Sequence, residues 1–136
     1  LFVTGANVTV PMASIVLRKS YGLGAQAMMG GSTKAPAACV AWPTGEFGGM
    51  GLEGAVRLGY RRELEAIEDP KLREQSFQDR VASMYEHGKA LNAASHFEID
   101  DVIDPADTRR WLAAILNSSP LPQPRVGKKR PNIDTW

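Results

Sequence analysis

Two runs of apolar residues in the first third of the chain have the length and composition of buried strands. The first, residues 12–17, reads MASIVL and lies between Pro11 and the basic residues Arg18 and Lys19. The second, residues 36–43, reads PAACVAWP and has a proline at each end. Short apolar runs between such breaks are typical of strands in the interior of a sheet, so we predict two buried strands here.

Helical spacing of apolar residues dominates much of the remaining chain. After the first strand, the stretch AQAMM predicts a short helix from about Gly24 to a stop at Gly30 and Gly31. Another helix is predicted from Leu52. The longest is expected over residues 71–97, where apolar side chains and one glycine recur every three or four positions on one face. These residues are Leu72, Phe77, Val81, Met84, Tyr85, Gly88 and Leu91.

The last part of the chain predicts a short extended segment, a helix and a tail. Residues 98–104 read EIDDVID and are expected to be extended, and Pro105 and Asp107 mark the first turn of a helix. Residues 118–136 contain four prolines and predict an extended arm. Because each predicted strand is followed by a glycine loop and a helix, the pattern indicates one α/β domain over residues 1–117.

Composition excludes several classes of protein. The 136 residues include 16 basic and 15 acidic side chains, and a net charge of +1 does not favour binding to nucleic acid. No apolar run approaches the roughly 20 residues that a bilayer span needs, and no signal peptide is recognisable, so we expect no membrane association. The single cysteine, Cys39, is compatible with a reducing compartment, and we expect bacterial cytoplasm or mitochondrial matrix. Because Leu1 opens an apolar stretch without a helix-start signal, we expect the chain to be cut from a longer protein.

The glycine loop after the first predicted strand is the clearest candidate for a functional site. Residues 22–27 satisfy the dinucleotide-binding spacing G-x-G-x-x-A. However, four residues separate them from the strand, and the acidic residue expected about 20 positions later is missing. A phosphate loop of the Walker type would also need a Gly-Lys-Ser/Thr ending. The loop is therefore either a tight connection or another kind of site.

An oxyanion hole is the other kind of site that this loop fits. A helix that begins just after a glycine turn points its first amide N–H groups outward, at the positive end of the helix dipole. Such donors stabilise an oxygen that gains negative charge during a reaction. Leu23 and Gly24 occupy this position in the sequence.

Three motifs extend this interpretation: VPMASIVLRKSYGLGAQAM, CVAWPTGEFGGMGLEGAV and FEIDDVIDPADTRRWL. Together they resemble the C-terminal domain of the carboxyltransferase subunit of biotin-dependent acyl-CoA carboxylases, over residues 1 to about 116. The resemblance implies a crotonase-like α/β fold, in which ββα units form a superhelix. It also implies an enzyme that moves the carboxyl group of carboxybiotin to the α carbon of an acyl-CoA.

The resemblance further implies which residues act. Biotin and the acyl group each pass through an oxyanion, and the C-terminal domain supplies the backbone donors for the biotin ureido oxygen. These donors fall on the amides of Leu23 and Gly24, where many members of the family have Gly-Gly-Ala over residues 22–24. A polar Gln26 falls at a position that selects the acyl group. Residues expected to line the biotin side are Gly22, Ala25, Trp42, Pro43, Thr44, Gly49, Met50 and Gly51.

The partners that the resemblance implies are an N-terminal carboxyltransferase domain, a biotin carboxyl carrier and a biotin carboxylase subunit, in a homo-oligomer with biotin as the cofactor. Two alternatives remain. In an enoyl-CoA hydratase or isomerase of the same fold, Glu46 and Glu53 would serve as acid and base. In a non-catalytic assembly module, the apolar helix faces would serve only to hold subunits together.

Other residues with reactive side chains have structural interpretations. His87 is expected on the solvated side of the long helix, and His96 has no second ligand at metal spacing, so we expect no metal site. Cys39 is predicted to be a buried, inert thiol. Asp100, Asp101 and Asp104 are expected to cap helices or to pair with Arg109 or Arg110.

Overall fold

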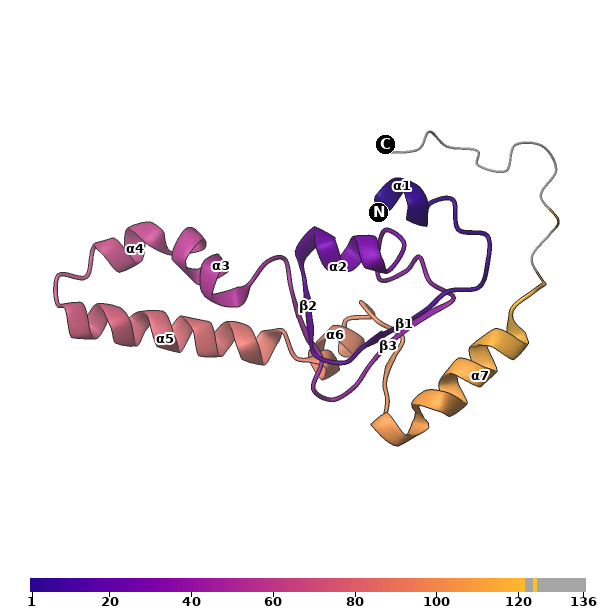
Figure 1. The fold of residues 1–136 in the computed structure, drawn as a ribbon. Helices are drawn as coiled ribbons and strands as arrows, with labels where there is room; N and C mark the ends of the chain where they lie inside the picture. Colours follow the sequence, from indigo (N-terminus) through magenta and orange to yellow (C-terminus); the bar gives the residue numbers. More distant parts are fainter. Residues whose placement is uncertain (122–123, 125–136) are drawn as a thin grey trace.

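The computed structural model describes residues 1–121 and residue 124, and Figure 1 shows how the elements are arranged. Along the chain they are α1 (Phe2–Gly5), β1 (Ala13–Val16), β2 (Lys19–Tyr21), α2 (Gly22–Met28), β3 (Ala38–Ala41), β4 (Glu46–Gly48), α3 (Leu52–Gly59), α4 (Arg61–Glu65), α5 (Pro70–His87), α6 (Ala90–Ser95), β5 (Asp101–Val102), the 3-10 helix η1 (Pro105–Asp107) and α7 (Thr108–Ser118).

All strand pairs in the described part of the chain are parallel. Strands β1, β3 and β5 form one sheet in that order, with Ile15 opposite Val40. Strands β2 and β4 form a second sheet, with Tyr21 opposite Gly48. The chain therefore passes twice through the same sequence of elements, β1-β2-α2 and β3-β4-α3, and corresponding strands pair with each other. This ββα repeat has no evident counterpart in the sequence.

The sheets and helices α2 and α6 enclose one apolar core. Its buried members come from β1, β3, α6, the residue after α2 and the segment before β5, and they are Val16, Met29, Cys39, Ala41, Ala90 and Ile99. Cys39, Val40 and Ala41 are completely buried, which agrees with the continuous apolar run in the sequence of β3. The two predicted strands are thus confirmed, and β3 occupies the centre of the larger sheet.

A helical hairpin of α3, α4 and α5 extends away from the sheets (Figure 1). It has its own core of Val56, Leu64, Phe77 and Val81. The Arg80 guanidinium lies 4.1 Å from the centroid of the Tyr60 ring and pairs with Glu63 at 2.7 Å, which joins α5 to α4. No helix in this part of the chain, or elsewhere among the described residues, has the length and apolar character that crossing a membrane requires.

The prediction of one long helix over residues 71–97 is wrong. The structure has two helices, α5 and α6, separated at Gly88 and Lys89. Leu72 and Leu91 were expected on the buried face, but they are 61% and 71% exposed. The three-to-four-residue spacing in the sequence runs through this break and places Gly88 on the buried face. Gly88 is indeed buried, but against the backbone of Phe47 in β4 and not inside a helix.

Three further differences concern short elements. Strands β2 and β4 were not predicted, because each has three residues and no apolar alternation. Helix α2 begins at Gly22 rather than near Gly24. The predicted helix after Pro105 is confirmed as η1 and α7, and it ends at Ser118, where the predicted tail starts. Most of that tail, residues 122–123 and 125–136, lies outside the described residues.

Phe97 follows α6 in a backbone conformation that favours glycine. Its φ is +59°, and its side chain is 82% exposed. The Phe97 amide donates to the Ala94 carbonyl and the Glu98 amide to the Ala93 carbonyl, each at 2.9 Å. These are the two hydrogen bonds of a Schellman turn, in which glycine is the usual residue at the left-handed position. A side chain there costs roughly 1–2 kcal/mol in backbone strain.

We expect Phe97→Gly to raise the free energy of unfolding by roughly 0.5–1 kcal/mol, since relief of strain exceeds the entropy that glycine adds to the unfolded chain. Urea denaturation measures this change. Phe97→Ala is the matched control, because it removes the exposed ring but keeps the Cβ and therefore the strain. Equal stabilisation by both variants would show that the ring, and not the backbone conformation, is the source of the effect.

Candidate functional site

A groove of about 580 Å³ lies where four segments of the chain meet. It is lined by the segment that runs from β2 through α2 to Thr33, by the end of β4 and the loop after it, by the end of α5, and by α6 with the residues that follow. The lining residues include Leu23 and Gln26 from α2, Gly49 after β4, His87 from α5 and Asn92 from α6. The groove is thus built by residues far apart in the sequence.

Gly22 is the residue of the glycine loop that the backbone geometry requires. Its φ is +68°, and a Cβ at this position would lie 3.0 Å from the carbonyl oxygen of Gly49. Because of this left-handed residue, the chain turns directly from β2 into α2. Leu23 and Gly24 consequently lie in the first turn of α2, where amide N–H groups have no acceptor within the helix.

Leu23 and Gly24 both have open space around them. Leu23 lines the groove with a side chain that is 70% exposed, whereas Gly24 is not among the lining residues. Gly24 has no atom within 4 Å of the position that a Cβ would take. The bare backbone at residue 24 is therefore not demanded by packing inside the described structure, in contrast to that at Gly22.

The predicted biotin-side residues separate into two groups. Gly22, Ala25 and Gly49 line the groove, as does Gln26, the predicted selector of the acyl group. Trp42, Pro43, Thr44, Met50 and Gly51 are not part of the groove lining. The structure therefore brings only the first group together.

Trp42 and Thr44 instead connect the loop between β3 and β4 to other elements. The Trp42 indole Nε1 donates a hydrogen bond to Thr108 Oγ1 at 3.0 Å, at the start of α7. Thr44 Oγ1 donates to the carbonyl oxygen of Leu17 at 2.5 Å. Both contacts hold the loop against the body of the domain.

Glu46 and Glu53 each accept a hydrogen bond from a tyrosine. The distances are 2.7 Å from Tyr21 to Glu46 and 2.8 Å from Tyr85 to Glu53. The pKa of the Tyr21 hydroxyl is raised above its usual range, first by burial and then by the hydrogen bond to Glu46. Neither carboxylate belongs to the groove lining, so the described structure does not direct an acid–base pair into the groove.

Cys39 is buried, as predicted, which is the usual setting of an unreactive thiol. It is fully buried in β3, and burial raises the pKa of its thiol to about 11. Its amide donates to the Asp100 carboxylate at 2.8 Å. Asp100 thereby binds the centre of the sheet to the segment before β5 and pairs with Lys34 at 3.9 Å, in place of the expected helix cap or pairing with Arg109 or Arg110.

The remaining aspartates also have structural contacts. Asp104 caps η1, since its carboxylate accepts from the Ala106 amide at 2.8 Å. Arg110, which was expected to pair with one of the earlier aspartates, pairs with Asp107 at 2.9 Å instead. Residues 1–121 contain no group of three His, Cys, Asp or Glu side chains arranged to hold a metal ion.

Both histidines line the groove, which the sequence did not predict. His87 Nδ1 lies 2.8 Å from the Ser83 carbonyl oxygen, and His96 Nδ1 lies 2.9 Å from that of Asn92. His87 was expected to be solvated on the polar side of a continuous helix. It is exposed, but the end of α5 brings it to the groove. The sequence signal available was a histidine directly before a glycine.

A family model described as a carboxyl transferase domain matches residues 3–130 of the chain. Among curated proteins, the chain is 39% identical over 133 residues to the methylmalonyl-CoA carboxyltransferase 12S subunit of Propionibacterium freudenreichii subsp. shermanii. It is also 39% identical over 133 residues to the carboxyltransferase subunit of propionyl-CoA carboxylase from Haloferax mediterranei. Each comparison covers 94% of this chain and 24% of the relative, so the chain spans about a quarter of the length of these relatives.

Two solved structures resemble the chain closely. A single-chain, multi-domain long-chain acyl-CoA carboxylase is 59% identical with a TM-score of 0.71, over 84% of this chain and 11% of that one. The hexameric transcarboxylase 12S, with methylmalonyl-CoA bound, is 34% identical with a TM-score of 0.79, over 96% of this chain and 25% of that one.

Proposed function

The chain belongs to the carboxyl transferase family, and from this premise we propose that it is the biotin-side half of an acyl-CoA carboxyltransferase. The fold is the crotonase-like α/β fold, to which the parallel ββα repeat corresponds. Residues 1–117 are proposed to be the C-terminal domain of a carboxyltransferase subunit. The substrate class is an acyl-CoA, and the 59% identity to a long-chain acyl-CoA carboxylase favours a long acyl chain.

The observation that carries this proposal is the first turn of α2 beside the groove. The left-handed Gly22 starts the helix so that the amides of Leu23 and Gly24 are free of intrahelical acceptors. Two such donors, held by a strand and a helix, are preorganised for an oxygen that gains negative charge. We propose that they donate to the ureido oxygen of biotin.

The groove has the size and donor set for this group. Its volume of about 580 Å³ lies within the range typical of small-molecule sites. Space is open at the Cβ positions of Gly24 and Gly49, and Gly49 lines the groove, so bare backbone can be approached closely there. When bound, biotin supplies the carboxyl group that is transferred. The residues of this chain bind and orient its ureido ring.

Partners follow from the same proposal. Biotin would arrive on a carrier domain that is loaded by a biotin carboxylase, and the remaining part of the carboxyltransferase would hold the acyl-CoA. The transcarboxylase 12S relative assembles as a hexamer, and we propose that the protein containing this chain is likewise a homo-oligomer. Gln26, on the groove side of α2, is the proposed selector of the acyl group.

The complete subunit containing this chain provides the test. We expect it to transfer carboxyl groups from a biotinylated carrier to an acyl-CoA, with long-chain acyl-CoA preferred over propionyl-CoA, and we expect avidin to abolish the transfer. In contrast, Glu46→Gln and Glu53→Gln should each retain measurable transfer, because these carboxylates bind tyrosines outside the groove. A hydratase acid or base contributes about 10²–10⁴-fold. A loss of that size in a folded variant, or insensitivity to avidin, would favour the hydratase alternative.

A further inference from the structure

The end of α5 is held rigidly against the strand that leads to the groove. Gly88 is buried, and its carbonyl oxygen accepts from the Phe47 amide at 2.7 Å. A Cβ at Gly88 would lie 2.5 Å from the Phe47 carbonyl oxygen, so no larger residue fits there. Phe47 in turn pairs with Ser20, two residues before Gly22. His87 is therefore linked to the start of α2 through consecutive backbone contacts.

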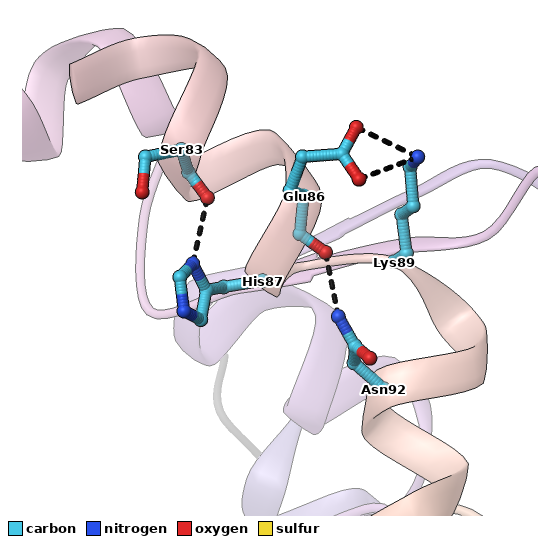
Figure 2. A network of polar contacts seen from close by, with 5 residues as sticks. All are labelled: Ser83, Glu86, His87, Lys89 and Asn92. Atoms are coloured by element: carbon cyan, nitrogen blue, oxygen red, sulfur yellow. Dashed lines mark hydrogen bonds and ion pairs between the residues drawn. The ribbon is translucent and has the colours of Figure 1, made fainter. Parts of the chain in front are cut away.

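Side chains complete the hydrogen bonding of this helix end (Figure 2). The Ser83 carbonyl oxygen lies 2.8 Å from His87 Nδ1, and the Glu86 carbonyl oxygen accepts from Asn92 Nδ2 at 2.7 Å. The Glu86 carboxylate pairs with Lys89 at 2.7 Å. These contacts fix both the turn between α5 and α6 and the orientation of the imidazole ring.

The contact with Ser83 also determines which nitrogen of His87 carries the proton. A carbonyl oxygen only accepts hydrogen bonds, so Nδ1 must be the donor. In the neutral imidazole, Nε2 then has a lone pair and accepts. Figure 2 shows this second nitrogen directed away from the helix. The contact with the helix end uses only Nδ1. Nε2 is therefore an acceptor that this contact does not use, on a residue that lines the groove.

A ureido ring needs such an acceptor beside its oxyanion donors. The ring has one carbonyl oxygen flanked by two nitrogens, and a nitrogen that carries no carboxyl group is an N–H donor. If the oxygen is bound by the amides of Leu23 and Gly24, this N–H requires a partner in the same groove. His96 and Glu98 also line the groove, where they follow α6 on either side of the left-handed Phe97. His87 instead directly precedes Gly88, whose carbonyl oxygen binds Phe47 beside the strand that leads to Gly22.

We propose that His87 Nε2 accepts a hydrogen bond from the ureido N–H of biotin and so orients the ring against the Leu23 and Gly24 amides. This inference rests on the proposed function. It gives the groove a recognition element on α5 that complements the donors on α2. His87 acts here in binding and orientation, and no proton transfer is assigned to it.

Two substitutions separate this role from helix capping. The amide nitrogen of Asn reaches the position of Nδ1, so His87→Asn retains the donor to Ser83 and removes the acceptor in the groove. The amide oxygen of Gln reaches the position of Nε2, so His87→Gln retains the acceptor and removes the cap. We expect His87→Asn to weaken biotin binding about 2- to 10-fold with an unchanged melting temperature, and His87→Gln to bind nearly as the wild type does.

The probes are free biotin and biotin methylated at the ureido nitrogen that keeps its N–H in carboxybiotin. Dissociation constants are measured by calorimetry on the complete subunit. Methylation removes the N–H, so it should weaken binding to the wild type and have a much smaller effect on His87→Asn. Equal affinities of wild type and His87→Asn for biotin, or equal losses in both variants, would overturn the assignment. A wild type that binds biotin in this pattern but transfers no carboxyl group would support the hydrogen bond and contradict the proposed function.

Discussion

Gly24→Val is expected to lower carboxyl transfer by about 10²–10³-fold in the complete subunit, which is the usual cost of losing one oxyanion donor. The branched side chain would stand next to the two amides that we propose to bind the ureido oxygen. Folding should be retained, because Gly24 has a right-handed φ and no atom within 4 Å of its Cβ position. The loss should appear mainly in kcat, since the donors act on charge that develops during the reaction.

A matched control is available in α3. Gly59 is also a helical glycine with no atom within 4 Å of its Cβ position, and it ends α3 instead of standing in the first turn of the helix beside the groove. Gly59→Val therefore has the same propensity cost at a distance from the groove, and it should transfer carboxyl groups at nearly the wild-type rate. Near-normal turnover of a folded Gly24→Val variant would remove the oxyanion role from the amides of Leu23 and Gly24.

Residues 1–136 alone are expected to catalyse no detectable carboxyl transfer. The chain spans about a quarter of the length of its relatives, and on our proposal it contributes one of the two pairs of backbone donors that the reaction needs. Large apolar side chains also remain exposed in α2 and in the segment between β1 and β2. Leu23 and Met28 are 70% and 76% exposed, and Leu17 is 50% exposed. Such a surface is expected to pack against the remaining part of the subunit.

The measurement compares equal molar amounts of the isolated chain and the complete subunit, with circular dichroism to establish that the isolated chain is helical. Addition of the separately produced remainder of the subunit should restore transfer if the two parts associate. Robust avidin-sensitive transfer by residues 1–136 without it would show that this chain holds a complete site, and the division of donors between two domains would be wrong.

The sequence by itself determined the features that depend on short stretches of chain. Strands β1 and β3 were predicted because an apolar run between breaks is typical of a buried strand, and η1 with α7 because Pro105 and Asp107 mark the start of a helix. The glycine turn before α2 was predicted because only glycine adopts a left-handed φ without strain. The motifs around it were sufficient to indicate the family.

Only the tertiary structure decided how these pieces meet. Strands β2 and β4 are stabilised by pairing with each other, which three-residue sequences cannot reveal. The break at Gly88 results from contact with the backbone of Phe47, 41 positions earlier in the chain, whereas the local spacing favoured a continuous helix. That break brings His87 to the groove, and the loop contacts of Trp42 and Thr44 direct those residues elsewhere. Helix and turn preferences act over a few neighbouring residues, but a groove lined from four segments depends on contacts between residues that only folding brings together.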